Sequence, residues 1–301
     1  MISVAPPAPE AAPARAGLGP AVFAELSKLR RQRPTWLLAG IVYLLLGLVL
    51  FAFAQDPLVA SDVGHRPLAA LEQMLPAIQF VFTAGVGLVM LTTGSRLVGI
   101  EYSLGTIRII VGRGTGRAQL VLAKLLATLL VGSTLLVGYC LLASVGLTLV
   151  TLHLTGSLTP MARLPAAGWR DLGLGVASCA ISAAACAAVG VGLAAATRSL
   201  TAGMVLSILF FPLDNAMALA FRGLFQLDQL HLWQVLSAAL LGPTLNRLPQ
   251  ALVGHGGTVS QALPQPMLQL PQLAALGVVA AWTLGLTALA VLTSVRGDIL
   301  A

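Results

Sequence analysis

Long apolar segments alternate with short polar ones along most of this 301-residue chain. A helix that crosses a membrane needs about 20 consecutive, mostly apolar residues. Six segments satisfy this length, so the pattern predicts an all-α polytopic membrane protein in which residues 35–299 form one six-span domain. The predicted spans cover approximately residues 36–54, 75–93, 120–152, 172–196, 200–220 and 273–293.

Two segments of different character precede the first predicted span. Residues 1–20 are rich in proline and alanine and contain no apolar run of signal-peptide length, so we expect a disordered cytoplasmic tail. Residues 21–34 predict an amphipathic helix that lies at the membrane surface. Its expected apolar face comprises Val22, Leu26 and Leu29. The residues expected opposite are Glu25, Lys28, Arg31 and Gln32, and Arg30 and Arg33 add further positive charge.

Composition agrees with a membrane protein. Hydrophobic residues make up 57% of the chain and charged residues 9%, whereas soluble domains contain about 45–50% and about 25%. The mean hydropathy is +0.92. A soluble protein of this size could not keep its surface hydrated with so few charges.

The net charge of +7 is distributed unevenly between the two sides of the predicted topology. Twelve of the 17 lysines and arginines fall in the N-terminal segment, the second-to-third loop, the fourth-to-fifth loop and the C-terminal tail. Cytoplasmic loops carry the excess of these residues, so we place both termini in the cytoplasm. The positive charge thus has a topological explanation, with membrane lipid as its partner and no nucleic acid.

The most distinctive polar segment lies between the second and third predicted spans, at residues 97–117. It contains the order Glu-x-x-x-Gly-Thr-x-Arg, followed by a basic, glycine-rich turn and an Ala-Lys pair at the start of the next span. We expect Gly105 to interrupt the helix there and Thr106 to begin a new turn. The residues that form this pattern are Glu101, Gly105, Thr106, Arg108, Arg113, Arg117 and Lys124.

This order resembles the permease subunits of type-2 ABC transporters, and the resemblance extends over about residues 21–299. It implies the membrane-spanning half of an ATP-driven exporter, in the inner (cytoplasmic) membrane. Two copies of a separate ABC ATPase subunit and a second permease chain, identical or related, would complete the transporter. ATP and Mg would bind to the ATPase, and this chain would hold no cofactor.

The resemblance also implies roles for individual segments. Residues 21–34 would be the interfacial elbow helix of the family, although a generic basic membrane anchor has the same physics. The 97–117 loop would be a cytoplasmic coupling helix, with Glu101 bonded to the ATPase and Arg108 and Arg113 around that contact. A Glu101→Lys chain would then fold but lose cargo-stimulated ATP hydrolysis. The outer segment 221–272 would contain re-entrant helices, the first near residues 230–241.

Asp214 and Asn215 are the candidates for a transport pathway, because a carboxylate inside a span is costly and often functional. The alternative is that the helix unwinds at Pro212, which would put Asp214 in the outer interface near Arg222. No catalytic or metal-binding set is recognisable, and no Walker motif occurs in the sequence, so ATP hydrolysis requires a partner.

Two other functions and two questions of assembly remain open from the sequence. An ATP-independent carrier or channel would use charged residues in mid-span, for which only Asp214 qualifies. An intramembrane enzyme would need a catalytic cluster, and none is visible. The cargo cannot be inferred, and the small residues of the fourth span could pack within the chain or against a second permease. These residues are Gly173, Ala177, Ala184, Ala188 and Gly192.

Overall fold

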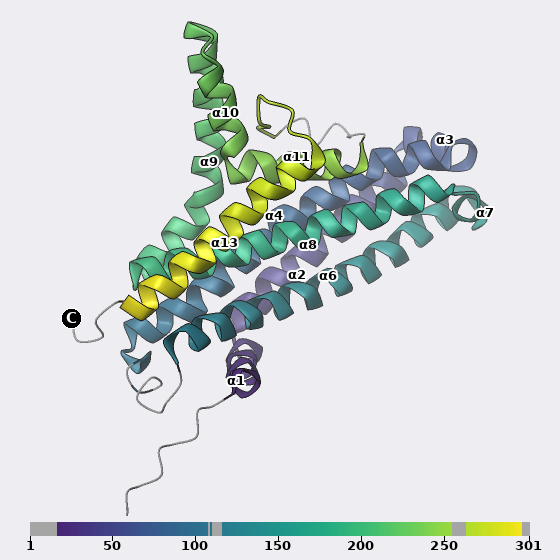
Figure 1. The fold of residues 1–301 in the computed structure, drawn as a ribbon. Coiled ribbons are helices and arrows are strands. Elements are labelled where there is room, and N and C mark those ends of the chain that lie inside the picture. Colours follow the sequence, from purple (N-terminus) through teal and green to yellow (C-terminus); the bar gives the residue numbers. More distant parts are fainter. Residues whose placement is uncertain (1–16, 108, 110–115, 255–262, 297–301) are drawn as a thin grey trace, which may run out of the picture.

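The computed structural model describes residues 17–107, 109, 116–254 and 263–296, and these residues form helices and no strand (Figure 1). The bounds are α1 (Leu18–Arg30), α2 (Arg33–Gln55), α3 (Pro57–His65), α4 (Pro67–Ser103), α6 (Arg117–Thr155), α7 (Thr159–Ala162), α8 (Ala166–Thr197), α9 (Leu200–Asp228), α10 (His231–Ala239), α11 (Leu241–Val253) and α13 (Gln272–Arg296).

Six of the described helices are long and apolar enough to cross a membrane: α2, α4, α6, α8, α9 and α13. Each contains one of the predicted spans, so the prediction of a polytopic all-α protein with six spans is confirmed. Helices α4 and α6 are the longest, at 37 and 39 residues. Their extra turns carry polar residues that the apolar segments alone did not include.

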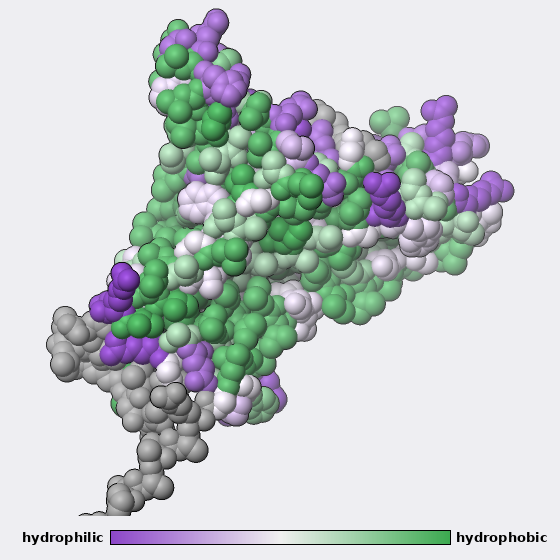
Figure 2. All heavy atoms as spheres, in the orientation of Figure 1, coloured by the Kyte–Doolittle hydropathy of each residue, from purple (hydrophilic) through white to green (hydrophobic). Residues whose placement is uncertain are grey.

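The helices form a bundle with distinct ends (Figure 1). Helices α2, α4, α6, α8 and α13 run side by side, whereas α9 diverges from them and α10 folds back along it. Helix α1 lies at one end of the bundle, and α3 and α7 lie at the other. Apolar side chains cover the flank between these ends, and polar ones gather at the tips (Figure 2). A helical bundle surrounded by lipid requires such an apolar flank.

Helix α8 occupies the centre of the bundle because its small residues let other helices approach its backbone. A Cβ at Gly190 would lie 2.7 Å from the carbonyl oxygen of Leu91 in α4. One at Gly192 would lie 3.0 Å from the carbonyl oxygen of Leu286 in α13. Small residues permit such close packing in lipid. The C-terminal half of α8 thus packs closely against other helices of this chain. At Gly173, near the other end of α8, nothing lies within 4 Å of an added Cβ.

The connection between α9 and α13 contains two helices, of which the sequence analysis located only the first, near residues 230–241. Helix α10 ends at Ala239, and α11 begins at Leu241. Pro243 lies in the first turn of α11, where backbone N–H groups have no partner within the helix, so proline is tolerated. Whether α10 and α11 re-enter the membrane stays a prediction.

The close contact of α8 with α4 predicts a specific sensitivity to side-chain size. Replacing Gly190 by leucine should destabilise the chain by about 1–3 kcal/mol, because overpacking forces the two backbones apart. The matched control is Gly173→Leu in the same helix, where nothing lies within 4 Å of an added Cβ. Thermal unfolding of both variants in mild detergent would check this. Equal melting temperatures would contradict the close-packed arrangement.

Candidate functional site

Four charged side chains meet where α1 crosses the end of α4 and the beginning of α6. Glu25 and Lys28 come from α1, Glu101 from the last turn of α4, and Lys124 from the third turn of α6. We call these four residues the charge cluster. Its carboxylates and ammonium groups alternate and cancel, so the cluster as a whole carries no net charge.

Lys124 is the most deeply buried cation of the charge cluster, with 2% of its surface exposed. Its Nζ lies 2.9 Å from Oε1 of Glu101 and 3.3 Å from Oε1 of Glu25. It also donates a hydrogen bond of 2.6 Å to the carbonyl oxygen of Leu97 in α4. A lysine ammonium has three protons, and three acceptors surround this one. Its burial is therefore compensated by contacts with both α1 and α4.

Lys28 closes the charge cluster from the solvent side. Its Nζ lies 2.8 Å from Oε1 of Glu25 and 2.7 Å from Oε1 of Glu101. Burial by itself lowers the pKa of Lys28, but the hydrogen bonds and negative charges of Glu101 and Glu25 outweigh that effect and leave the pKa raised. A raised lysine pKa means that the contribution of Lys28 to stability is complete at neutral pH and disappears only in strongly alkaline solution.

The position of Glu25 corrects the predicted faces of the first helix. We expected this residue on the polar face, opposite Val22 and Leu29. Glu25 is 2% exposed and lies on the same side of α1 as the buried Leu29. Periodicity alone assigns a carboxylate to the solvent, and the partner that reverses this assignment, Lys124, is almost 100 residues away in the sequence.

The other basic residues of the N-terminal segment do not join the charge cluster. Arg30, Arg31 and Arg33 are exposed. Helix α1 ends at Arg30, and Pro34 lies in the first turn of α2, so the predicted segment 21–34 spans the end of one helix and the beginning of the next. The location of α1 at the membrane surface stays a prediction.

The connection between α4 and α6, residues 104–116, is called the coupling segment, and it begins with a left-handed turn. Helix α4 ends at Ser103, and Gly105 follows with φ of 66°, a conformation that glycine adopts without strain. The hydroxyl of Thr106 points back to the carbonyl oxygen of Glu101, at 3.5 Å, which is long for a hydrogen bond. Arg108 and Arg113 lie outside the described residues.

Arg117, the first residue of α6, connects the C-terminal end of the coupling segment to α13. Its guanidinium donates a hydrogen bond of 3.0 Å to the carbonyl oxygen of Val295 in α13. Arg198, between α8 and α9, makes the equivalent bond to Thr293, also at 3.0 Å. Arginines at this end of the bundle thus satisfy carbonyl groups in the last turns of α13, where cations are favourable.

Glu101 has partners within its own chain that the resemblance did not indicate. Its expected bond to an ATPase stays a prediction. Glu101 is 4% exposed and its bonded oxygen contacts Lys28 and Lys124 of its own chain. Lys124 belonged to the recognised pattern, but its role as the buried counter-ion was missed. A lysine inside the predicted third span was the available signal, because such residues are rarely left without a partner.

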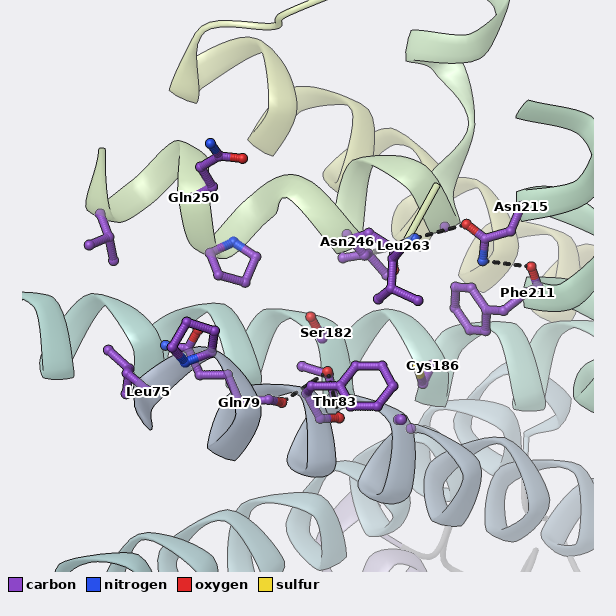
Figure 3. Close-up of a pocket in the computed structure, with 18 of the residues that line it drawn as sticks. Leu75, Gln79, Thr83, Ser182, Cys186, Phe211, Asn215, Asn246, Gln250 and Leu263 are labelled. Carbon is purple, nitrogen blue, oxygen red and sulfur yellow. Dashed lines mark hydrogen bonds between the residues drawn. The ribbon is translucent and has the colours of Figure 1, made fainter. Parts of the chain in front are cut away.

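Asp214 and Asn215 join α9 to α11. Asp214 is buried, and one oxygen of its carboxylate accepts a hydrogen bond from the N–H of Gly242 in the first turn of α11. The amide oxygen of Asn215 accepts a 2.8 Å bond from Asn246, also in α11 (Figure 3). A carboxylate at a helix N-terminus is favourable, which gives Asp214 a structural function.

Two details of the sequence-based alternative for Asp214 were wrong. Helix α9 continues through Pro212 to Asp228 without unwinding. Arg222 does not lie beside Asp214 as a partner; its guanidinium points to the carbonyl oxygen of Gln265, at 3.4 Å. The carboxylate instead accepts a hydrogen bond from the backbone N–H of Gly242 in α11, a helix whose position the sequence analysis had not located.

A cavity of about 520 Å³ lies beside this junction, bounded mainly by α4, α8, α9 and α11 (Figure 3). Asn215 and Asn246 line it near the junction, and Gln79 and Ser182 line it from α4 and α8. In the described part of the chain, no group of three or more His, Cys, Asp or Glu residues is placed to hold a metal ion.

Comparison with known proteins assigns the family. The sequence model of a family described as "ABC-2 family transporter protein" matches residues 21–214, which is well over half of the chain. The matched region begins in α1 and includes the charge cluster, the coupling segment and Asp214. No curated protein matched the chain.

The burial of Glu25, Glu101 and Lys124 predicts a non-additive response to mutation. Lys124→Met leaves two buried carboxylates with one ammonium, and breaking a buried ion pair in this way costs about 3–5 kcal/mol. Adding Glu101→Gln should recover part of that loss, since Glu25 and Lys28 then form a neutral pair. The free energy of unfolding in a detergent titration measures both effects, with the exposed Arg31→Met as control. A double variant no more stable than Lys124→Met would refute this coupling.

Proposed function

The chain belongs to the ABC-2 family of transporter proteins, as a type-2 ABC permease, and on this premise we propose that it forms the translocation path of an ATP-driven exporter. The family implies partnership with an ABC ATPase. We propose two ATPase copies, which bind ATP and Mg, and a second permease chain. We propose an inner-membrane location, and the distribution of basic residues supports an orientation with both termini in the cytoplasm.

The observation that carries the proposed mechanism is the position of the charge cluster around the coupling segment. Residues 104–116 connect α4 to α6, and Glu101 and Lys124 lie on the two sides of this connection. Both are bonded to residues of α1. A force applied to the coupling segment would therefore act on the ends of three helices at once.

The energetics favour transmission of this force as a rigid-body movement. Separating α1 from α4 and α6 would break the contacts of Lys28 with Glu101, at 2.7 Å, and of Lys124 with Glu25, at 3.3 Å, so that each buried charge loses one of its two partners. Moving the three ends together keeps every ion pair intact. ATP binding would close the ATPase subunits, and the coupling segment would convey that closure to α4 and α6 and, through the charge cluster, to α1. Cargo would then leave toward the outer face.

Glu101 has a positioning role in this mechanism. Its carboxylate holds α4 against α1 and α6, and we propose that other residues of the 97–117 segment contact the ATPase. The Glu101→Lys variant is consequently a poor test of docking. It would place three ammonium groups beside one carboxylate in a buried site, so the fold itself would be damaged.

Arg113 offers a test of docking that leaves the charge cluster intact. Arg113→Glu reverses a charge in the coupling segment, and we expect at least tenfold less ATPase subunit to co-purify with the tagged chain, with lower vanadate-sensitive hydrolysis in the eluate. Charge reversal at an interface costs affinity because opposite charges become like charges. The measurement is affinity purification from mild detergent followed by an ATPase assay.

The matched control is Arg163→Glu, the same substitution at an exposed arginine at the opposite end of the bundle. This variant should retain the ATPase subunit. Equal retention by both variants, with unchanged hydrolysis, would remove the coupling segment from the docking interface. A chain that purifies alone and moves solute in liposomes without ATP would overturn the exporter assignment altogether.

A further inference from the structure

A groove opens on the apolar flank of the bundle, at the end opposite α1. Its walls are α6 and α8, its floor is α4, and α3 and α7 close it at the end of the bundle (Figure 1). Its volume of about 430 Å³ lies within the range of about 300–1,000 Å³ that is usual for ligand pockets. Trp169 and Val176 of α8 line the groove and are 56% and 41% exposed, so a molecule can enter it from the flank.

Small residues of α8 leave this groove open. Gly173 lines it, and a Cβ added there would meet no atom within 4 Å. Gly175, two residues further along the helix, lies directly against the amide of Gln79, which closes the groove on the side of α4. A side chain at position 173 would therefore occupy part of the groove, and its size would determine what the groove can hold.

The lining of the groove suits an acyl chain. No charged residue of the described chain lines it. Each hydroxyl group of the lining donates to a backbone carbonyl oxygen. Tyr139 donates to Ile78 at 2.8 Å, and Ser144, Thr148 and Thr151 donate to the residue four positions earlier, at 2.7–2.8 Å. These donors are already satisfied, and an occupant without polar groups loses no hydrogen bond to water when it enters.

Three exposed arginines lie at this end of the bundle, and each adjoins in sequence a residue that lines the groove. They are Arg66, beside Pro67, Arg163, beside Leu164, and Arg170, beside Trp169. None of the three forms an ion pair with another described residue. Most lysines and arginines of the chain fall on the other side of the predicted topology, so arginines here call for a local explanation.

Trp169 indicates the depth of the groove in the bilayer. It lies in the first turn of α8 and is exposed, and tryptophans at the ends of spans favour the level of the lipid headgroups. Arg170 follows it directly. A phosphate group at this level can pair with a guanidinium group, whose planar set of donors matches it. The acyl chains of the same lipid would extend toward the middle of the bilayer, along the groove between α6 and α8.

We propose that this groove binds one acyl chain of an anionic phospholipid, from the leaflet next to α3 and α7, while Arg163 and Arg170 hold its phosphate. The uncharged lining argues for the acyl chain, the arginines argue for the anionic headgroup, and the opening on the flank makes the bilayer the source. The site lies within a single chain and goes beyond the proposed function, because binding requires neither an ATPase nor a cargo.

Two photoreactive phospholipids with the same acyl chains test this site. One is a phosphatidylglycerol and the other a phosphatidylcholine, each with a diazirine in the middle of one chain. Each is titrated against the purified chain in mild detergent, without ATPase, and the labelled residues are mapped by mass spectrometry. We expect saturable labelling of groove residues in α6 and α8 by phosphatidylglycerol. Labelling by phosphatidylcholine should be about fivefold weaker, since a basic residue near the surface favours an anionic headgroup by about that factor.

Gly173→Phe tests whether the acyl chain lies in the groove. The added ring would occupy the same space as the chain, so we expect about tenfold less labelling of the groove residues by phosphatidylglycerol. The matched control is Gly277→Phe in α13, an exposed glycine outside the groove where an added Cβ also meets no atom within 4 Å. This control should be labelled like the unsubstituted chain, and melting temperatures verify that both variants are folded.

A double variant, Arg163→Gln with Arg170→Gln, tests the contact with the headgroup. It should label equally with the two lipids, because the groove remains while the preference for the anionic headgroup is lost. The control is Arg31→Gln with Arg33→Gln, which removes the same charge from exposed residues at the α1 end of the bundle. This control should keep the preference for phosphatidylglycerol.

Several outcomes would overturn the proposal. Labelling that does not saturate, or that spreads evenly over exposed residues of α2, would show general contact of the flank with lipid. Undiminished labelling of the groove in Gly173→Phe would mean that the acyl chain lies elsewhere. Equal labelling of the unsubstituted chain by the two lipids would remove the arginines from the site. These results would leave the proposed coupling to an ATPase untouched, because the ATPase is absent from the experiment.

Discussion

An apolar surrounding supplies no solvent to polar groups, and this constraint explains where the polar residues of this chain lie. In the charge cluster, Oε1 of Glu25 and Oε1 of Glu101 each contact both ammonium groups at the end of the bundle, whereas Oε2 of each has no hydrogen-bond partner among the described residues. The buried carboxylate of Asp214 accepts a hydrogen bond from a backbone N–H group of α11.

The charge cluster also gives the coupling segment a mechanical setting. The segment joins the last turn of α4 to the first turn of α6, and Glu101 in that last turn and Lys124 in the third turn of α6 are attached to α1 by ion pairs of 2.7 and 3.3 Å. Close backbone packing then continues from α4 to α8 and from α8 to α13. A displacement that begins at the coupling segment therefore has a continuous, well-packed route into the bundle. The diverging α9 and its partner α11 lie beside that route, next to the cavity.

The sequence predicted the spans well because a span is a local property, set by length and apolarity. The same reasoning was wrong for Glu25, whose burial depends on Lys124 in another helix. It also did not locate α11, because Gly242 and Pro243 ordinarily signal a turn. The family resemblance indicated the importance of Glu101 but could not reveal that its partners are within the chain. Pairing between distant segments, as between Asp214 and α11, leaves no periodic signal in a single sequence.

The central claim is that α1, α4 and α6 move as one unit when the ATPase closes. The most direct measurement is the distance between spin labels at the exposed Ser27 of α1 and Leu122 of α6, by pulsed electron paramagnetic resonance on the reconstituted transporter. Loss of ATP hydrolysis confirms trapping with vanadate. The account predicts the same narrow distance distribution in the nucleotide-free and vanadate-trapped states. A distance that shifts on trapping would show that α1 separates from α6, and would contradict the role assigned to the charge cluster.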